Sequence, residues 1–263
     1  MFKLLRSFVG KILPESLQMK IIIFLSDSFW LLRKYFLGAE LNYPKEFLNN
    51  WKSIKKKSSQ DRERNFTLYQ LIQIHNEIFK NKKTSVIEFG VDRGGTISTI
   101  SKFIKPNTNI FALDSFGEYS DQIKENVTNL DPHYKGTYKP FTKKTRFKDF
   151  NYKDLENKLN GDLVSKNCNL KLICCYFPDT LTEEDKNTLK HQTYSFVHFD
   201  FDLYKPTTEA INFVLPKLEK NAILLFDDFN MINQDGVKPA VLESKIIFNR
   251  CFQTSGGQLI CFT

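Results

Sequence analysis

Residues 194–230, YSFVHFDFDLYKPTTEAINFVLPKLEKNAILLFDDFN, decide the fold of this chain. The apolar run at their start predicts a strand over 194–200, followed by a turn that Pro206 interrupts. Apolar residues at helical spacing then predict a helix over 207–218, and a second apolar run predicts a strand over 222–226. A strand, a helix and a second strand in this order are typical of a parallel α/β sheet.

Four acids follow the two predicted strands. Asp200 and Asp202 come after the first strand, and Asp227 and Asp228 come after the second. Parallel strands bring their carboxyl ends to the crevice where open sheets bind ligands. Four carboxylates so close together are costly to bury unless a hard cation or a shared proton neutralises them. The sequence therefore predicts a divalent-metal site here, with a solvated cap on the two strand ends as the simpler alternative.

A glycine-bearing turn comes earlier, in residues 84–98, TSVIEFGVDRGGTIS. A short apolar strand runs into Gly90, and Gly94 and Gly95 open a helix that we expect to continue to Ile104. Glycine lets the backbone approach a ligand closely, and the amino end of a helix presents unpaired N–H groups to a carboxylate or a phosphate. A tight turn without a ligand would show the same glycines.

The strand predicted over 109–113 ends in Asp114, and an acid in this place can accept both hydroxyls of a ribose. The glycines match neither the P-loop, which needs Gly-Lys-Ser/Thr, nor the full G-x-G-x-x-G pattern. These departures favour a nucleoside that lacks a pyrophosphate. S-adenosylmethionine (SAM) is the commonest such ligand on this scaffold, so we expect SAM as a cofactor.

The remaining segments complete a doubly wound α/β fold. Residues 117–161 are polar and aromatic and leave the alternation of strands and helices, so we expect a lid or substrate-binding insertion there, or else a surface loop. We also expect a strand over 170–176, a helix over 236–248 and a hairpin over 250–262. The chain from residue 59 to 263 is thus expected to form a mostly parallel, seven-stranded Rossmann-like sheet with an antiparallel carboxyl-terminal hairpin.

Residues 1–58 are expected to form a helical, amphipathic amino-terminal extension. Basic side chains lie among apolar ones in residues 1–37, so this part can pack on the domain, form a contact in a homo-oligomer, or lie on an anionic membrane surface. The next apolar pattern predicts a helix that starts near Asp61. His75 on that helix is interpreted as a surface histidine.

The formal charge of +8 and the pI near 9.1 permit anionic partners, but the lysines are scattered, so we expect solvated surfaces and no nucleic-acid partner. The 5 cysteines are odd in number and suit a reducing compartment. No segment reaches the roughly 18 apolar residues of a membrane span, and the first residues lack a secretory-signal pattern. We expect a cytoplasmic protein, either free or peripheral at the inner face of the membrane.

Motifs in a fixed order between Arg62 and Phe262 resemble one known family. They are Glu88-Phe89-Gly90-Val91 with Gly94-Gly95, Asp114-Ser115-Phe116, Phe177-Pro178-Asp179-Thr180-Leu181, Asp200-Phe201-Asp202-Leu203-Tyr204, and Asp227-Asp228-Phe229 with Gly236 downstream. Together they resemble the macrocin O-methyltransferases, class I SAM-dependent enzymes that methylate sugar hydroxyls on macrolides, aminocoumarins and similar glycosides. Phe201, where the family often has a small residue, and Gly117-Glu118-Tyr119-Ser120, in place of its usual Gly-Leu-Pro run, depart from the family pattern.

The resemblance implies a SAM-dependent and Mg²⁺-dependent O-methyltransferase that acts on a hydroxyl of a surface glycan, a glycolipid or a secondary metabolite. By this resemblance Asp200, Asp227 and Asp228 look like the magnesium ligands. The glycine turn and the resemblance together indicate cofactor contacts from Glu88, Gly90, Val91, Gly94, Gly95, Thr96, Asp114, Ser115, Phe177 and Asp200.

Three candidates remain for the general base. Asp202 is similar to the acid proposed for this role in some family members. His198 shares a strand face with Asp200 by strand alternation, and water or metal-bound hydroxide is the third candidate.

Two other classes of function use the same residues differently. Asp200-Phe201-Asp202 is an acid-x-acid motif of the kind that holds the metal and the sugar nucleotide in glycosyltransferases. A non-catalytic scaffold that docks on a membrane through its amino-terminal stripe is the other alternative. Two features speak against the glycosyltransferase: the glycine turn and Asp114 come first in the chain, and the Asp227-Asp228 pair has no ready role there.

Overall fold

The computed structural model describes residues 43–130, 141–230, 236–246 and 248–263. Within them, seven strands form one sheet in the order β3-β2-β1-β4-β5-β7-β6. Strands β1 to β5 are parallel, and β7 pairs antiparallel with both β5 and β6. The predicted fold class, including its carboxyl-terminal hairpin, is confirmed. The strands are β1 (Thr84–Phe89), β2 (Thr108–Asp114), β3 (Asn169–Cys174), β4 (Tyr194–Phe199), β5 (Leu218–Phe226), β6 (Arg250–Gln253) and β7 (Leu259–Phe262).

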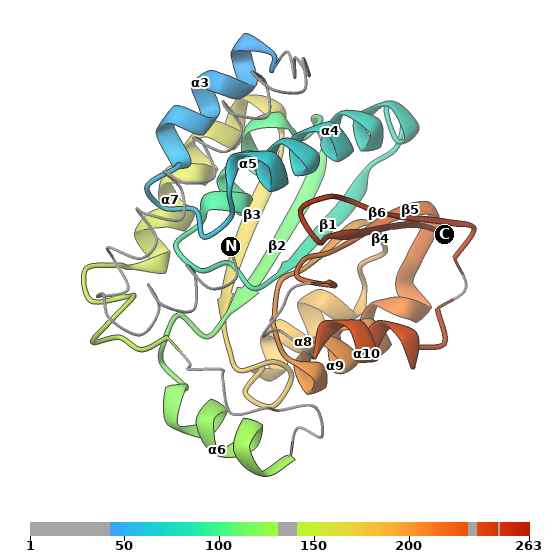
Figure 1. The fold of residues 1–263 in the computed structure, drawn as a ribbon. Coiled ribbons are helices and arrows are strands. Elements are labelled where there is room, and N and C mark those ends of the chain that lie inside the picture. The colour runs from blue at the N-terminus through green and yellow to red at the C-terminus, as the bar shows by residue number, and fades with distance from the viewer. Residues whose placement is uncertain (1–42, 131–140, 231–235, 247) are drawn as a thin grey trace, which may run out of the picture.

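Helices cover both faces of the sheet (Figure 1). One face lies under α4, α5 and α7, and the other lies under α8, α9 and α10. Helix α3 lies outside α4 and α5, and α6 stands beyond one end of the strands (Figure 1). The helices are α3 (Lys45–Ile54), α4 (Arg62–Ile78), α5 (Gly95–Phe103), α6 (Ser120–Leu130), α7 (Tyr152–Leu163), α8 (Glu183–Lys190), α9 (Tyr204–Val214) and α10 (Val237–Leu242).

Two hydrophobic cores result from the alternation of side chains along each strand. Phe196 of β4 and Leu225 of β5 belong to the core under α4, α5 and α7. Their neighbours Val197 and Phe226 point the other way, into the core under α9 and α10. Because helices cover both faces of the sheet, the central strands consist largely of continuous apolar residues.

Three elements differ by several residues from their predicted bounds. Helix α9 begins at Tyr204, because Pro206 stands in the first turn, where its missing N–H costs no intrahelical hydrogen bond. It ends at Val214, and a 3-10 turn follows over Leu215–Lys217. Strand β5 begins earlier than predicted, and α10 takes up only 6 residues of the range 236–248.

The described part of the amino-terminal extension packs on the domain. Phe47 and Trp51 of α3 form an aromatic cluster with Phe66 and Tyr69 of α4. Residues 1–42 lie outside the described part, and so does the whole stretch for which we predicted a membrane or subunit contact. No helix among the described residues is long and apolar enough to cross a membrane.

His75 is buried, so its interpretation as a surface histidine is wrong. It follows the buried Leu71 and Ile72 by four and three residues, which places it on the same side of α4. Its Nε2 lies 2.8 Å from Ser195 Oγ of β4. Burial lowers the pKa of His75 to about 4.

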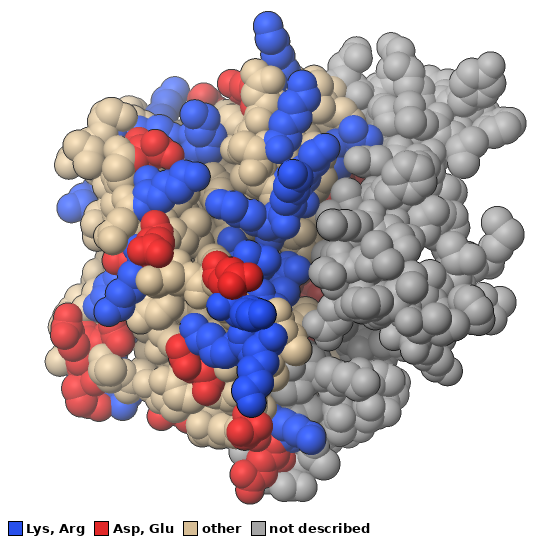
Figure 2. Space-filling view, turned by 90° about the vertical axis from the view of Figure 1, so that its left-hand side faces the viewer, with Lys and Arg blue, Asp and Glu red and all other residues tan. Residues whose placement is uncertain are grey.

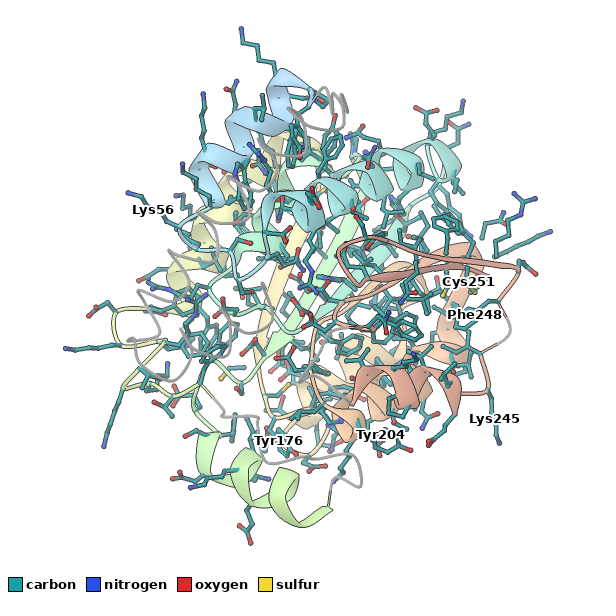
Figure 3. All side chains as sticks on the ribbon, in the orientation of Figure 1. Lys56, Tyr176, Tyr204, Lys245, Phe248 and Cys251 are labelled. Atoms are coloured by element: carbon teal, nitrogen blue, oxygen red, sulfur yellow. The ribbon has the colours of Figure 1, made fainter. Side chains whose placement is uncertain are left out.

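The described residues of the 117–161 insertion include α6 and the first part of α7. Ile123 of α6 packs with Tyr176 and Leu203, which follow β3 and β4. Figure 3 shows Tyr176 at the end of the sheet next to α6. Helix α6 therefore lies against loops at the carboxyl ends of the strands.

Candidate functional site

A cleft of about 260 Å³ opens at the carboxyl ends of the parallel strands. Its walls include Gly90, Asp114 and the four predicted acids, together with Gln60 and Arg64 from the start of α4. A larger hollow of about 440 Å³, lined by lysine and asparagine side chains, lies at the opposite edge of the sheet. It contains none of the predicted site residues, so we place the functional site in the smaller cleft.

Gly90 stands where β1 and β4 end in close contact. Its φ is +91°, and a Cβ at this position would lie 2.1 Å from the carbonyl oxygen of Asp200. Gly94, with a φ of 85°, precedes α5 as its N-cap residue. A Cβ on Gly95 would lie 2.5 Å from Ser58 Cα, so the segment before α4 rests on the start of α5. The turn therefore lies beside both the acids and the amino-terminal segment.

Asp114 holds the glycine turn in place. Its Oδ2 accepts the backbone N–H of Val91 over 2.7 Å and that of Asp92 over 2.8 Å. Its Oδ1 accepts the N–H of Phe116 over 2.6 Å. Burial raises the pKa of Asp114 to about 6 despite these three donors. The acid predicted to bind a ribose thus also shapes the turn.

Strands β4 and β5 deliver their acids side by side. The N–H of Asp200 donates to the last carbonyl of β1 over 2.7 Å, and that of Asp227 to the last carbonyl of β4 over 2.8 Å. Carboxylate oxygens of Asp200, Asp202 and Asp228 lie within 4.8 Å of one another. Burial first, and then repulsion between the acids, raises the pKa of Asp200 and of Asp202 well above its usual value.

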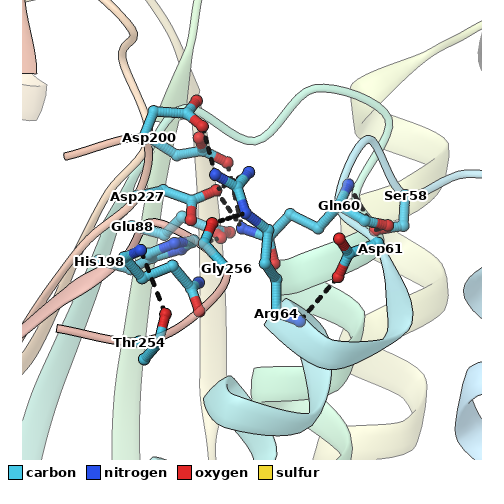
Figure 4. A network of polar contacts seen from close by, with 12 residues as sticks. Ser58, Gln60, Asp61, Arg64, Glu88, His198, Asp200, Asp227, Thr254 and Gly256 are labelled. Carbon is cyan, nitrogen blue, oxygen red and sulfur yellow. Dashed lines mark hydrogen bonds and ion pairs between the residues drawn. The ribbon is translucent and has the colours of Figure 1, made fainter. Parts of the chain in front are cut away.

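One cation from the chain itself, the guanidinium of Arg64 in the first turn of α4, lies among these acids (Figure 4). Its Nη1 donates to Asp227 Oδ2 over 3.1 Å, its Nη2 donates to Asp228 Oδ1, and its Nε donates to the carbonyl of Gly256 over 3.0 Å. Gln60 Nε2 donates to the same Asp227 oxygen over 2.8 Å. Burial alone would lower the pKa of Arg64, but the two carboxylates outweigh burial and raise it.

His198 and Glu88 form a buried pair behind the acids. They stand opposite each other in the register of β4 and β1, and His198 Nδ1 lies 2.8 Å from Glu88 Oε1. Both side chains are 0% exposed. No described residue hydrogen-bonds to His198 Nε2, and a ring nitrogen of His198 lies within 4.8 Å of carboxylate oxygens of Asp200 and Asp227. His198 is thus next to the acids but sealed from the cleft.

The acids fit a hard divalent ion such as Mg²⁺. Carboxylate oxygens are the ligands that this ion prefers, and Asp200, Asp227 and Asp228 all line the cleft. Their closest groupings divide them, because ligand atoms within 4.8 Å of one another belong either to Asp200, Asp202 and Asp228 or to His198, Asp200 and Asp227. The Oδ1 of Asp227 is buried and accepts from no described residue, which leaves it available as a ligand. Four carboxylates and one guanidinium together carry a net negative charge that a divalent ion would balance. The raised pKa values of Asp200 and Asp202 agree with this excess of negative charge.

The predicted cofactor residues fall into two groups. Those that line the cleft are Gly90, Asp114, Ser115, Phe177 and Asp200. Those that surround it are Glu88, Val91, Gly94, Gly95 and Thr96, and each of these five is buried. Sequence patterns did not identify Gln60 and Arg64, which lie just after the predicted boundary between the amino-terminal extension and the domain.

Comparison with known proteins supports the fold. No family model and no curated protein matches the sequence. The apo structure of CalS11, a TDP-rhamnose 3'-O-methyltransferase of calicheamicin biosynthesis, is 15% identical, with 90% of this chain and 93% of that chain covered and a TM-score of 0.54. A second CalS11 structure is 16% identical, with 87% and 89% covered and a TM-score of 0.54. The O-methyltransferase NovP is 15% identical, with 78% and 81% covered and a TM-score of 0.49.

Proposed function

The fold is that of the class I SAM-dependent methyltransferases, and we propose that the protein is such an enzyme and methylates a hydroxyl of a sugar or a glycoside. The observation that carries this proposal is one cleft that joins the glycine turn and Asp114 to four acids. The likeness to CalS11, which acts on TDP-rhamnose, favours a sugar as the acceptor.

The chain would bind its two cofactors at the two ends of the cleft. The glycine turn and Asp114 would hold SAM, which supplies an electrophilic methyl group. Asp200, Asp227 and Asp228 would hold the divalent ion, which when bound lowers the pKa of an acceptor hydroxyl. Methyl transfer is an in-line displacement, so alignment of the acceptor oxygen by the cleft can supply several kcal/mol.

Asp202 is the better candidate for the general base. It lines the cleft beside the predicted metal ligands, where an acceptor hydroxyl would lie. His198 is 0% exposed and is not among the residues that line the cleft, so an acceptor in the cleft does not contact it directly, although its Nε2 has no hydrogen-bond partner among the described residues. We therefore assign His198 to the support of the site, and water is the remaining alternative to Asp202.

The acceptor would enter past Phe201, which lines the cleft between the two acids of its motif.

Lysine and arginine side chains form a band on the side of the molecule that carries α3 and α7 (Figure 2). Burial lowers the pKa of Lys57, and the nearby positive charges of Lys158 and Arg93 lower it further. Such a band supports peripheral contact with an anionic membrane and an acceptor attached to a lipid or a surface glycan.

Calorimetry with S-adenosylhomocysteine (SAH) tests the proposal. We expect SAH to bind the full chain with micromolar or higher affinity, and methyl transfer from SAM to a sugar acceptor to require Mg²⁺. Binding of a UDP-sugar without binding of SAH would replace this proposal with a glycosyltransferase. Binding of neither ligand would favour a scaffold without catalytic activity.

A further inference from the structure

Arg64 has contacts of a kind that a surface ion pair does not have. Its three nitrogens reach two carboxylates at the end of β5 and the carbonyl of Gly256 between β6 and β7. Its side chain is 10% exposed, whereas the lysine of the Lys82–Glu219 pair at the other edge of the sheet is 55% exposed. Three directional contacts and burial leave the guanidinium little freedom to turn.

The two carboxylate oxygens of Asp227 differ in their hydrogen bonds. Its Oδ2 accepts from both Arg64 and Gln60, while its buried Oδ1 accepts from no described residue. Oxygens of Asp227 and of Asp200 are within 4.8 Å of each other. The buried Oδ1 is therefore left for a ligand, while Oδ2 lies on the side of Asp200, whose own Oδ2 is 3.5 Å from the same Gln60 Nε2.

Asp228 is also held by a hydrogen bond from Arg64. Its Oδ1 accepts from Arg64 Nη2, and an oxygen of Asp228 lies within 4.8 Å of those of Asp200 and Asp202. In metal sites, the carboxylates that bind the ion are themselves held by hydrogen bonds from outside, which fix their orientation. Arg64 has this relation to both members of the Asp227–Asp228 pair.

We propose that Arg64 is a positioning residue whose planar fork orients the Asp227 and Asp228 carboxylates towards the divalent ion, with Gln60 as a second donor to Asp227. This inference rests on the proposed function, because it assumes that the acids bind a divalent ion. A guanidinium can hold two carboxylates at a fixed angle, whereas a lysine ammonium acts as a point charge. A positive charge by itself would oppose the binding of a metal ion, so the fork rather than the charge is the useful property.

The variant Arg64→Lys separates these two properties, because it keeps the charge and removes the fork. We expect its dissociation constant for Mn²⁺, measured on the full chain by calorimetry or electron paramagnetic resonance, to rise about 10- to 100-fold, as for other outer residues of metal sites. SAH affinity should stay at the wild-type value. Arg62→Lys is the matched control, since Arg62 lies in the same helical turn but stacks over Tyr43 at 5.0 Å, and it should bind Mn²⁺ as the wild type does.

Each outcome decides a different point. Wild-type or tighter Mn²⁺ binding by Arg64→Lys overturns the inference, and tighter binding would mean that Arg64 acts only as a competing charge. If Arg64→Lys does not fold in a thermal unfolding test without metal, Gln60→Leu replaces it, and unchanged Mn²⁺ affinity there also overturns the inference. If the wild type binds neither SAH nor Mn²⁺, the proposed function itself fails. If it binds SAH but not Mn²⁺, the metal and the role of Arg64 are both wrong, while the SAM assignment stands.

Discussion

Replacement of Asp114 gives the most direct test of the cofactor assignment. Backbone N–H groups already take three of the roughly four acceptor positions of its carboxylate. One position therefore remains for a ligand, and we expect Asp114 to accept one ribose hydroxyl rather than the two suggested by the sequence. A hydrogen bond to a charged acceptor contributes about 1.5–3 kcal/mol, which is roughly a 10- to 100-fold change in affinity.

The variant Asp114→Asn keeps the size of the side chain and removes its charge. It should bind 5'-methylthioadenosine, a fragment of SAM with an intact ribose, roughly 10- to 100-fold more weakly than the wild type. A double-mutant cycle with the 2'-deoxy and 3'-deoxy analogues isolates the contact. For one of the two analogues, loss of the hydroxyl should weaken binding to the wild type by the same roughly 10- to 100-fold factor. The same loss should change the affinity of Asp114→Asn very little. If each analogue weakens binding to both proteins equally, Asp114 does not contact the ribose.

Three further predictions concern the metal, a buried histidine and the glycine turn. Asp227→Asn should abolish Mg²⁺-dependent turnover and keep SAH binding; full wild-type activity in EDTA would contradict a role for the metal. The pKa of His75 is about 4 in the folded chain and 6.5 ordinarily, so the unfolded state binds the extra proton and stability falls as pH falls. Between about pH 8 and about pH 5, urea unfolding should show that the wild type loses about 2 kcal/mol relative to His75→Gln, and parallel pH profiles would exclude this explanation. Gly90→Ala should lower both the unfolding temperature and SAH affinity, because its Cβ would meet the carbonyl of Asp200 at 2.1 Å. Gly161→Ala, inside α7 and with open space around it, is the control that should leave SAH affinity unchanged and raise the unfolding temperature slightly, because alanine favours the helix.

Local patterns were sufficient to place the acids. Asp200 and Asp227 each follow a short apolar run of the length typical of a strand buried on both faces, and a helix of the right length connects the two runs. Such a connection makes the strands parallel neighbours, so their ends meet at one edge. The same logic placed Asp114 beside the glycine turn, because β2 is the next strand after β1 and pairs with it.

The partners of these acids could not be predicted in this way. Arg64 lies 163 residues before Asp227 in the chain and stands on a polar stretch of α4 that resembles a solvated surface. No period or motif connects the two positions, and only the packing of α4 across the sheet brings them together. His75 shows the same limit, because its spacing placed it on the buried side of α4, yet a histidine there is accepted only with a partner such as Ser195.

The short segment from Ser58 to Arg64 connects the glycine turn with the acids of the cleft. Ser58 rests on Gly95 at the cofactor turn, Gln60 N–H donates to Ser58 Oγ over 3.1 Å, and the side chains of Gln60 and Arg64 reach the acids. One stretch of chain therefore contacts both of the places that must be aligned for an in-line methyl transfer. Since a misplacement of about 1 Å can cost 100-fold in rate, a shift of this segment would change catalysis without touching either ligand.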